Sequence, residues 1–512
     1  MALATVYTRA SLGVDAPEIR VEVDLARGLP GFAVVGLPTA TIREAKDRVK
    51  AALMNAGLEF PPATKITVNL SPADLPKHGA RYELAIAVGI LVASGQIPQQ
   101  ATKDCEFYGE LALNGELLPV AGLVPALLAC RAAKRSAFVP LKNETEASLI
   151  SQQTSYLVTD LVSIFEHLHQ HNELRKAQPQ SLRQKPPEHD GDITDVLGQQ
   201  QAKRALLLAA AGRHHILFVG PPGTGKTMLA QRLMGLMPPL TETQALELAA
   251  IHSVAGLSGR KGWRRRDFRS PHHSCSAAAL VGGGSPPKPG EISLAHQSIL
   301  FLDELPEFSR HVLDSLREPL ESGQVTISRA AHQVSFPAAF QLVCALNPSP
   351  CGQFDGSLAS CRSTPDQILN YLNRLSGPLL DRIDIQVSVP RETESLRLIS
   401  KARLNEQQPN SESLRDKVAA AHQCQYQRQG CLNSDLKANL LLGICQLSET
   451  DHEFLIKAIE TLKLSHRAYH RTLRLARTIA DLDQQPAVQK SHLAEAMGYR
   501  ALDRLIQQVQ SL

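Results

Sequence analysis

Alternation of apolar and polar residues begins near the start of the chain. Residues 19–25 and 65–70 alternate apolar with polar or charged side chains, so each segment predicts a strand with one buried face. Between these segments a helical pattern, closed by Gly57 in C-cap position, has its apolar residues at Ile42, Ala45, Val49, Ala52 and Leu53. The first 170 residues are therefore expected to form a mixed α/β domain.

A polar segment separates this region from the rest of the chain. Residues 171–192 are rich in Gln, Pro, Lys, Arg and His, which is typical of a solvated linker. Beyond it, the apolar runs at 216–219, 299–302 and 342–346 have the pattern of buried parallel strands. We expect an α/β core at 193–390. A helical domain is expected at 391–512, where Leu, Ala, Gln and Arg dominate.

Composition places the chain among ordinary globular proteins. Its 512 residues are 43% hydrophobic and 20% charged, which excludes disulfide mini-proteins, disordered chains and rods. The net charge of +4 implies that any contact with nucleic acid is a local patch. Nine scattered cysteines favour reduced thiols. The longest uncharged apolar stretch, residues 84–95, is too short to span a membrane, and the N-terminus lacks a secretory signal, so we expect a soluble cytoplasmic protein.

A phosphate-binding loop is the strongest motif in the sequence. It follows one predicted strand and opens a helix, the context in which its backbone N–H groups converge on phosphates. Lys226 would reach the β and γ phosphates of ATP, and the Thr227 hydroxyl would bind Mg²⁺. The complete loop reads Gly220, Pro221, Pro222, Gly223, Thr224, Gly225, Lys226 and Thr227.

Polar residues follow the other two predicted strands. Asp303 and Glu304 come directly after 299–302, where Asp303 would hold Mg²⁺ through water and Glu304 would act as general base on the attacking water. Asn347 ends the third strand and could orient that water, although a turn-forming Asn is the simpler interpretation when it is taken alone.

Two arginines are candidates for stabilising the transferred phosphate. Arg382 lies between two aspartates in an apolar segment, which fits either a structural ion pair or an arginine finger delivered across a subunit interface. In the helical domain, one helix face carries Arg467, Arg471 and Arg474. This face is either a solvated surface or the part of a helix that brings an arginine to the γ phosphate.

The order of these motifs resembles the AAA+ ATPases, in the branch of magnesium-chelatase motors and minichromosome-maintenance helicases. The 77 positions from Lys226 to Asp303 leave room for that branch's insert in helix 2, and residues 325–336 look like its hairpin. More narrowly, residues 268–274, 282–292 and 375–384 resemble the ComM/YifB family. The resemblance implies a P-loop AAA+ core, a homo-hexamer and an ATP-driven motor on single-stranded or branched DNA. It also implies that Arg382 is the finger and Arg467 the second sensor.

The N-terminal domain, taken as 1–170, resembles the Lon-protease fold at 109–122. Lon-type proteolysis needs a Ser nucleophile and a Lys base, but the matching region reads 77–83 without that Ser, and the Lys position falls near Val124. We therefore expect a noncatalytic scaffold or DNA-contacting module. An ATP-dependent protease is disfavoured, with Ser71 and Lys77 as the residues whose loss would test it.

Metal chemistry is not favoured beyond Mg²⁺. Many relatives carry two Cys-x-Cys pairs after the residue that matches Asn347. In this chain two of those four positions are serines, and the two remaining thiolates do not make a closed zinc site. These four residues are Ser349, Cys351, Cys361 and Ser363. His272, His273 and Cys275 could ligate a metal, but substrate contact or packing is the simpler interpretation.

Residues 260–269 concentrate positive charge. The segment holds six basic residues, one acid and two aromatics, so it could bind DNA through phosphate contacts and stacking, or be a solvated loop. The candidate DNA contacts are Arg260, Lys261, Trp263, Arg264, Arg265, Arg266 and Arg269, with Arg329 and His332 on the expected hairpin.

The sequence supports two functions from different classes. An ATP-driven hexameric DNA translocase or branch-migration helicase, promoting recombination of incoming DNA in natural transformation, predicts hydrolysis stimulated by DNA. A chaperone-like ATPase, remodelling a protein partner as a magnesium-chelatase motor does, predicts stimulation by a protein. The N-terminal extension is unlike a bare chelatase motor, which favours the first.

Overall fold

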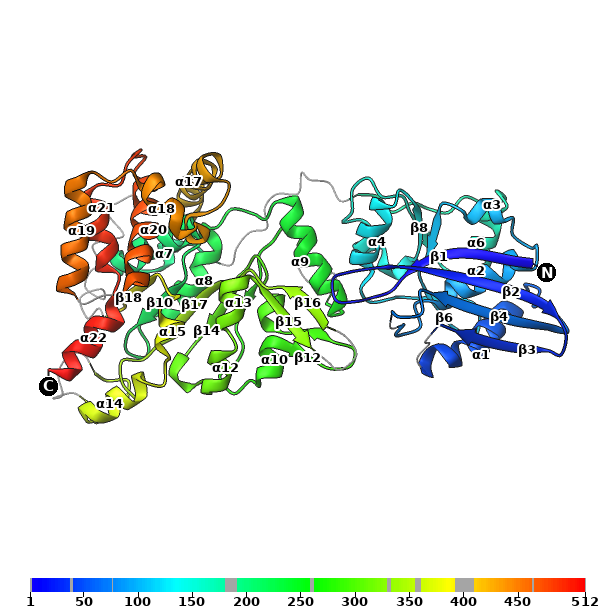
Figure 1. Ribbon diagram of the computed structural model, residues 1–512, viewed down its shortest axis with the longest axis horizontal. Helices are drawn as coiled ribbons and strands as arrows, with labels where there is room; N and C mark the ends of the chain where they lie inside the picture. Colours follow the sequence, from blue (N-terminus) through cyan, green and yellow to red (C-terminus); the bar gives the residue numbers. More distant parts are fainter. Residues whose placement is uncertain are drawn as a thin grey trace.

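A computed structural model describes residues 2–36, 40–75, 77–179, 191–257, 262–328, 333–354, 361–391, 409–462 and 465–511. The molecule is elongated, with the N-terminal domain at one end and the remaining elements at the other (Figure 1). Helix α9 (Glu242–Val254) lies between the two parts.

The N-terminal domain is built on a seven-stranded mixed sheet in the order β3-β4-β2-β1-β5-β8-β9. The two alternating segments of the sequence are confirmed as strands β2 and β4, which pair antiparallel. Helix α2 is buried along its whole length and packs on β1 and β2, so it forms the centre of this domain's core. The seven strands of the sheet are β1 (Ala2–Arg9), β2 (Glu18–Arg27), β3 (Gly31–Val35), β4 (Thr64–Ser71), β5 (Cys105–Phe107), β8 (Ser136–Pro140) and β9 (Ser155–Val158). A separate antiparallel ladder joins β6 (Glu110–Leu111) and β7 (Leu117–Leu118). The helices are α1 (Ala40–Asn55), α2 (Glu83–Ala93), α3 (Gln99–Thr102), α4 (Leu123–Ala132), α5 (Glu144–Ala147) and α6 (Leu161–Leu168).

A five-stranded parallel sheet, in the order β11-β14-β17-β10-β18, forms the second domain. Its three central strands confirm the predicted apolar runs, and all their residues are buried. The strands are β10 (Ile216–Val219), β11 (Phe268–Arg269), β14 (Ile299–Leu302), β17 (Gln341–Leu346) and β18 (Ile385–Ser388).

The predicted hairpin is confirmed as an antiparallel pair, β15 (Gln324–Ser328) and β16 (Gln333–Pro337). A second small ladder joins β12 (Gly282–Gly283) and β13 (Lys288–Pro289). The helices around the parallel sheet, besides α9, are α7 (Gln200–Gly212), α8 (Lys226–Leu236), α10 (Ala277–Val281), α11 (Glu291–Leu294), α12 (Arg310–Asp314), α13 (Arg317–Ser322), α14 (Pro365–Leu372) and α15 (Gly377–Leu380).

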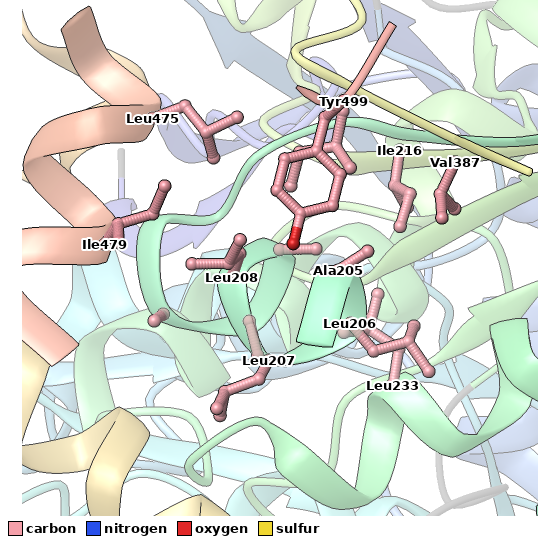
Figure 2. Packing of buried hydrophobic residues seen from close by; sticks show 14 of the residues in the cluster. Ala205, Leu206, Leu207, Leu208, Ile216, Leu233, Val387, Leu475, Ile479 and Tyr499 are labelled. Carbon is pink, nitrogen blue, oxygen red and sulfur yellow. The ribbon is translucent and has the colours of Figure 1, made fainter. Parts of the chain in front are cut away.

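Among the described residues of the C-terminal part, from 409 on, six helices follow, and they share a core with the parallel sheet. Helix α7 packs against β18 and α8 and also against α17 and α20. Figure 2 shows Leu206 and Leu208 of α7 between sheet residues such as Ile216 and α20 residues such as Ile479. The C-terminal helices are therefore fixed to the sheet through a buried apolar layer. They are α17 (Ser411–Gln429), α18 (Ala438–Cys445), α19 (Glu449–Thr461), α20 (His466–Leu482), α21 (Lys490–Gly498) and α22 (Ala501–Gln510).

The N-terminal domain docks on α9. The Gly122 and Val124 amides at the start of α4 donate to the carbonyl and the hydroxyl of Ser253, at 2.9 and 3.2 Å. The loop between β1 and β2 reaches the hairpin, because a Cβ at Gly13 would lie 2.5 Å from Val334 of β16. One domain thus contacts both elements that are inserted between the nucleotide-site strands.

Candidate nucleotide site

The phosphate-binding loop connects the end of β10 to the start of α8. Gly223 and Gly225 have φ of 80° and 84°, a region that side chains other than Gly rarely adopt. Gly220 lies against the residue that follows β18, since an added Cβ would come within 2.2 Å of the Val389 carbonyl oxygen. The glycines of the motif are therefore required by backbone geometry as well as by access for phosphates.

Lys226 and Asn347, 121 residues apart, meet at the carboxyl edge of the sheet. The Lys226 ammonium donates to the Asn347 Oδ1 at 3.0 Å and to the carbonyls of Gly220 and Pro221 at 2.7 and 2.8 Å. Burial lowers the pKa of Lys226, although the carboxylates of Asp303 and Glu304 act in the opposite direction. In this arrangement the ammonium is positioned among neutral oxygens that a phosphate can replace.

Asp303 and Thr227 make an oxygen pair suited to Mg²⁺. The Thr227 hydroxyl donates to the Asp303 Oδ2 at 3.0 Å, and hydroxyl and carboxylate oxygens are the ligands that Mg²⁺ prefers. Since both groups converge beside the loop, the residues present fit a magnesium ion bound with nucleotide. The second Asp303 oxygen accepts the Glu304 amide at 2.9 Å, which fixes the turn after β14.

Glu304 has a neighbour that sequence reasoning did not assign. Its backbone is left-handed, with φ of 52°, and its carboxylate is half exposed. The His273 Nδ1 lies 3.5 Å from the Glu304 Oε2, and the His273 ring stands edge-on to Phe308. The pair of histidines at 272–273 was the available signal, but its contact with a carboxylate 31 positions away has no sequence signature.

A cavity of about 760 Å³ adjoins the phosphate-binding loop. Gly220 and Pro221 form one wall and Phe354 another, while Arg391 and Arg504 add positive charge. The size and position suit the base and ribose of a nucleotide whose phosphates lie on the loop. Sequence reasoning missed both arginines, because Arg391 follows β18 and Arg504 lies in α22, and only the tertiary fold brings these two elements to this edge.

Arg382 and Arg467 lie at the opposite edge of the sheet. Asp384 directly precedes β18 and His215 directly precedes the parallel strand β10, and both line a cavity of about 620 Å³ together with Arg382 and Arg467. A four-residue strand is about 13 Å long, so this cavity at the amino ends is separated from Lys226 by about the length of a strand. The structure therefore brings the two arginines together but places neither at its own chain's phosphate-binding loop.

The surroundings of the two arginines differ. Arg382 is largely buried, pairs with Glu321 and donates to the Pro378 carbonyl, while its Nε has no partner among the described residues. Burial lowers the pKa of Arg382, and the nearby charge of Arg467 lowers it further. Arg467 is 63% exposed and lies 3.7 Å from Asp381.

The other two arginines of the helix face are structural contacts. The Arg471 Nη1 donates to the carbonyls of Leu380 and Ile383, both at 2.9 Å, and the Arg474 Nε donates to the Leu436 carbonyl at 2.9 Å. Of the stripe, Arg467 is the residue that remains open to solvent.

Arg266 is buried, which corrects the expectation that it is open to DNA, while Arg264 and Arg269 are half buried and bonded to other parts of the chain. Arg266 is 8% exposed and donates to the carbonyls of Pro238 and Gln297, and burial lowers its pKa to about 9. Arg269 makes two 2.7 Å hydrogen bonds to Glu291, and Arg264 donates to the Leu240 carbonyl at 2.6 Å.

Trp263 also differs from the expectation. It is half buried and packs on the apolar residues of α9 and of the N-terminal domain, so it joins the docking contact rather than offering a ring for stacking. Arg265 remains half exposed. Arg260, Lys261, Arg329 and His332 lie outside the described residues.

The residues named for a peptidase test have separate partners. The Lys77 ammonium is buried and donates to the Pro72 carbonyl, whereas the Ser71 hydroxyl accepts from Asn69 at 2.9 Å. Burial lowers the pKa of Lys77. Among the residues that the structure describes, no three His, Cys, Asp or Glu side chains cluster as metal ligands, and no helix combines the length and apolar character needed to cross a membrane.

The sheet order, the loop after β10, the acidic pair after β14 and the Asn after β17 define a P-loop ATPase of the AAA+ class. Three family models match in series: "Subunit ChlI of Mg-chelatase" at 21–143, "Magnesium chelatase, subunit ChlI" at 192–396 and "Magnesium chelatase, subunit ChlI C-terminal" at 408–500.

Full-length relatives give the narrower assignment. Competence protein ComM of Haemophilus influenzae is 49% identical over 517 residues, and the YifB protein of Escherichia coli is 46% identical over 513, each match covering all of both chains. Lon protease 2 of Bacillus subtilis is 25% identical over 227 residues, 40% of each chain. The chain belongs to the ComM/YifB family of magnesium-chelatase-like AAA+ ATPases.

Proposed function

We propose that this chain is an ATP-hydrolysing motor that acts on single-stranded or branched DNA as a ring of six copies. Its task would be branch migration, promoting recombination of incoming DNA during natural transformation. The observation that carries the proposal is the separation of Lys226 from Arg382 and Arg467 across one sheet. A site divided in this way is completed by a second copy.

Within one copy, the residues at the carboxyl ends of the strands would bind the nucleotide and activate the attacking water. The loop amides and Lys226 hold the phosphates, and Thr227 with Asp303 holds Mg²⁺, which would neutralise phosphate charge when bound. Glu304, half exposed beside Asp303, takes a proton from the attacking water, and the Asn347 amide orients that water.

The neighbouring copy would supply the arginines that the phosphate-binding site of one copy lacks. Arg382 and Arg467 line the same cavity, at the amino ends of the strands. A neighbour that places this cavity against the phosphate-binding loop would bring both guanidinium groups to one γ phosphate. Arg382 would exchange Glu321 for the phosphate, and the exposed Arg467 would exchange Asp381. Repeated head-to-tail with a rotation of one sixth of a turn between neighbours, this contact would build the proposed ring of six.

Action on DNA is supported by the relationship to a competence protein and by the fold. The hairpin strands β15 and β16 lie beside the N-terminal domain, where a ring would offer them to a polymer (Figure 1). We propose that the N-terminal domain, whose residues 109–122 resemble the Lon-protease fold but whose sequence lacks the Ser–Lys dyad, is a noncatalytic scaffold for these elements.

A second function has its own support. The match to magnesium-chelatase subunit models over three segments favours a motor that remodels a protein partner. The same hydrolytic residues would then be stimulated by protein and not by DNA.

The deciding experiment measures steady-state ATP hydrolysis with single-stranded, duplex and four-way-junction DNA at two salt concentrations. Glu304→Gln serves as the inactive variant, and Glu307→Gln, a nearby exposed carboxylate paired with Arg374, is the matched control. Stimulation that falls with salt supports the DNA motor. Hydrolysis that no DNA changes would exclude it in favour of the protein-remodelling function.

A further inference from the structure

Two thiols meet beside the nucleotide cavity. The Sγ atoms of Cys351 and Cys361 are 3.2 Å apart, although ten positions separate them in the chain. Both side chains are half buried, so small molecules in solvent can reach them. A disulfide bond is about 2.05 Å long, so the two sulfurs would need to approach by about 1.2 Å to form one.

The surroundings favour the thiolate of Cys351. The Ser349 hydroxyl lies 3.3 Å from its sulfur, and Ser363 and the Gln353 amide also donate to it. Burial opposes ionisation, but these hydrogen bonds and that from Cys361 outweigh it and lower the pKa of Cys351 to about 5. Thiolate is the nucleophile in disulfide exchange, and an adjacent second thiol resolves the first product.

The pair is tied to the nucleotide site through the chain itself. Gly352 follows Cys351 and packs on the phosphate-binding loop so closely that a Cβ there would be 2.9 Å from the Pro222 Cδ. Gln353 and Phe354 form part of the wall of the 760 Å³ cavity, and Asn347 lies four positions before Cys351. Movement of Cys351 therefore displaces the wall of that cavity.

We propose that Cys351 and Cys361 are a redox pair that closes to a disulfide in the presence of a low-molecular-weight disulfide such as oxidised glutathione, and that closure weakens nucleotide binding. The Cys351 thiolate attacks one glutathione sulfur, forming a mixed disulfide and releasing one glutathione thiolate. The Cys361 thiol loses its proton and attacks the Cys351 sulfur, which forms the internal bond and releases the second thiolate. The two protein thiols lose two electrons, the glutathione disulfide gains them, and the two thiol protons pass to the released thiolates.

The first measurement is chemical and does not depend on the proposed function. The full chain is reduced, exposed to oxidised glutathione, alkylated and analysed by peptide mass spectrometry. We expect a Cys351–Cys361 linked peptide that dithiothreitol removes. In Cys361→Ser, glutathione should instead remain on Cys351. If exposed Cys424 carries glutathione in the same sample and no linked peptide forms, the pair is refuted.

The second measurement follows binding of a fluorescent ATP analogue by reduced and oxidised protein. We expect oxidation to raise the Kd at least threefold and dithiothreitol to reverse the rise. The same rise should occur in Cys424→Ser and should not occur in Cys361→Ser. A linked peptide with unchanged Kd would refute the effect on the cavity. This test measures ATP binding and not hydrolysis. A chain that binds ATP but does not hydrolyse it would contradict the proposed motor, and the effect of oxidation on Kd could still be measured.

Discussion

Gly352 lies outside the phosphate-binding motif, yet its contact with Pro222 helps to fix the position of that loop. Its φ is +70°, which costs another residue about 1–2 kcal/mol, and an added Cβ would meet Pro222. Gly352→Ala should lower the free energy of unfolding by at least that amount and weaken ATP binding several-fold, as measured by denaturant titration and nucleotide titration.

The matched control is Gly443→Ala in α18. A Cβ at Gly443 meets nothing within 4 Å, and Ala is the better helix former by about 1 kcal/mol, so stability should stay the same or rise. Equal loss of ATP binding in both variants would contradict the role of the Gly352–Pro222 contact.

His215 predicts how stability depends on pH. Burial lowers its pKa to about 4, and its Nδ1 accepts the Leu342 amide, so the folded state holds the ring neutral. The unfolded chain binds the proton first, near pH 6.5, so stability is full above that pH and falls on acidification. From pH 7 to pH 5 the loss is about 2 kcal/mol from this group. Urea titrations at both pH values should give a smaller difference for His215→Asn than for the wild type, and equal differences would contradict the assignment.

Helix α20 presents two arginines with different tasks. Arg471 is 11% exposed and donates to one carbonyl at the end of α15 and one beyond it, so Arg471→Ala should cost about 2–4 kcal/mol of stability. Arg467 is exposed, so Arg467→Ala should leave the unfolding midpoint nearly unchanged and reduce ATP hydrolysis at least tenfold. Thermal unfolding and steady-state hydrolysis on both variants separate the two roles. A large loss of stability in Arg467→Ala would make that residue structural.

Prediction from sequence succeeded where the signal lies within one element. The strands at 216–219 and 299–302 are continuous apolar runs, and the antiparallel hairpin around residue 330 alternates apolar residues on both arms. It failed where burial depends on distant segments: Arg266 reads like its basic neighbours, yet two carbonyls from other loops enclose it. The contact of His273 with Glu304 and the arrival of Arg504 at the nucleotide cavity depend on chain crossings that no local pattern encodes.

At the scale of the whole molecule, the N-terminal domain and the nucleotide site are mechanically linked. Ser253 near the end of α9 accepts from Gly122 and donates to Glu146 of the N-terminal domain, while the β1–β2 loop touches the hairpin. The same hairpin leads into β17, which ends at Asn347. A change at the nucleotide can therefore reach the docked domain through the contacts of α9 and of the hairpin.

The divided catalytic apparatus gives the sharpest prediction for the assembly. Arg382→Ala and Lys226→Ala should each abolish hydrolysis alone, but in a randomly mixed ring about one quarter of the interfaces join an intact phosphate-binding loop to an intact Arg382. Equimolar mixing should thus restore about that fraction of wild-type hydrolysis. Mixing Lys226→Ala with Glu304→Gln is the matched control, since both defects lie at the same edge of the sheet and every site keeps one of them. Recovery in the control, or none in the test mixture when light scattering shows full-size assemblies, would place Arg382 outside the neighbour's site.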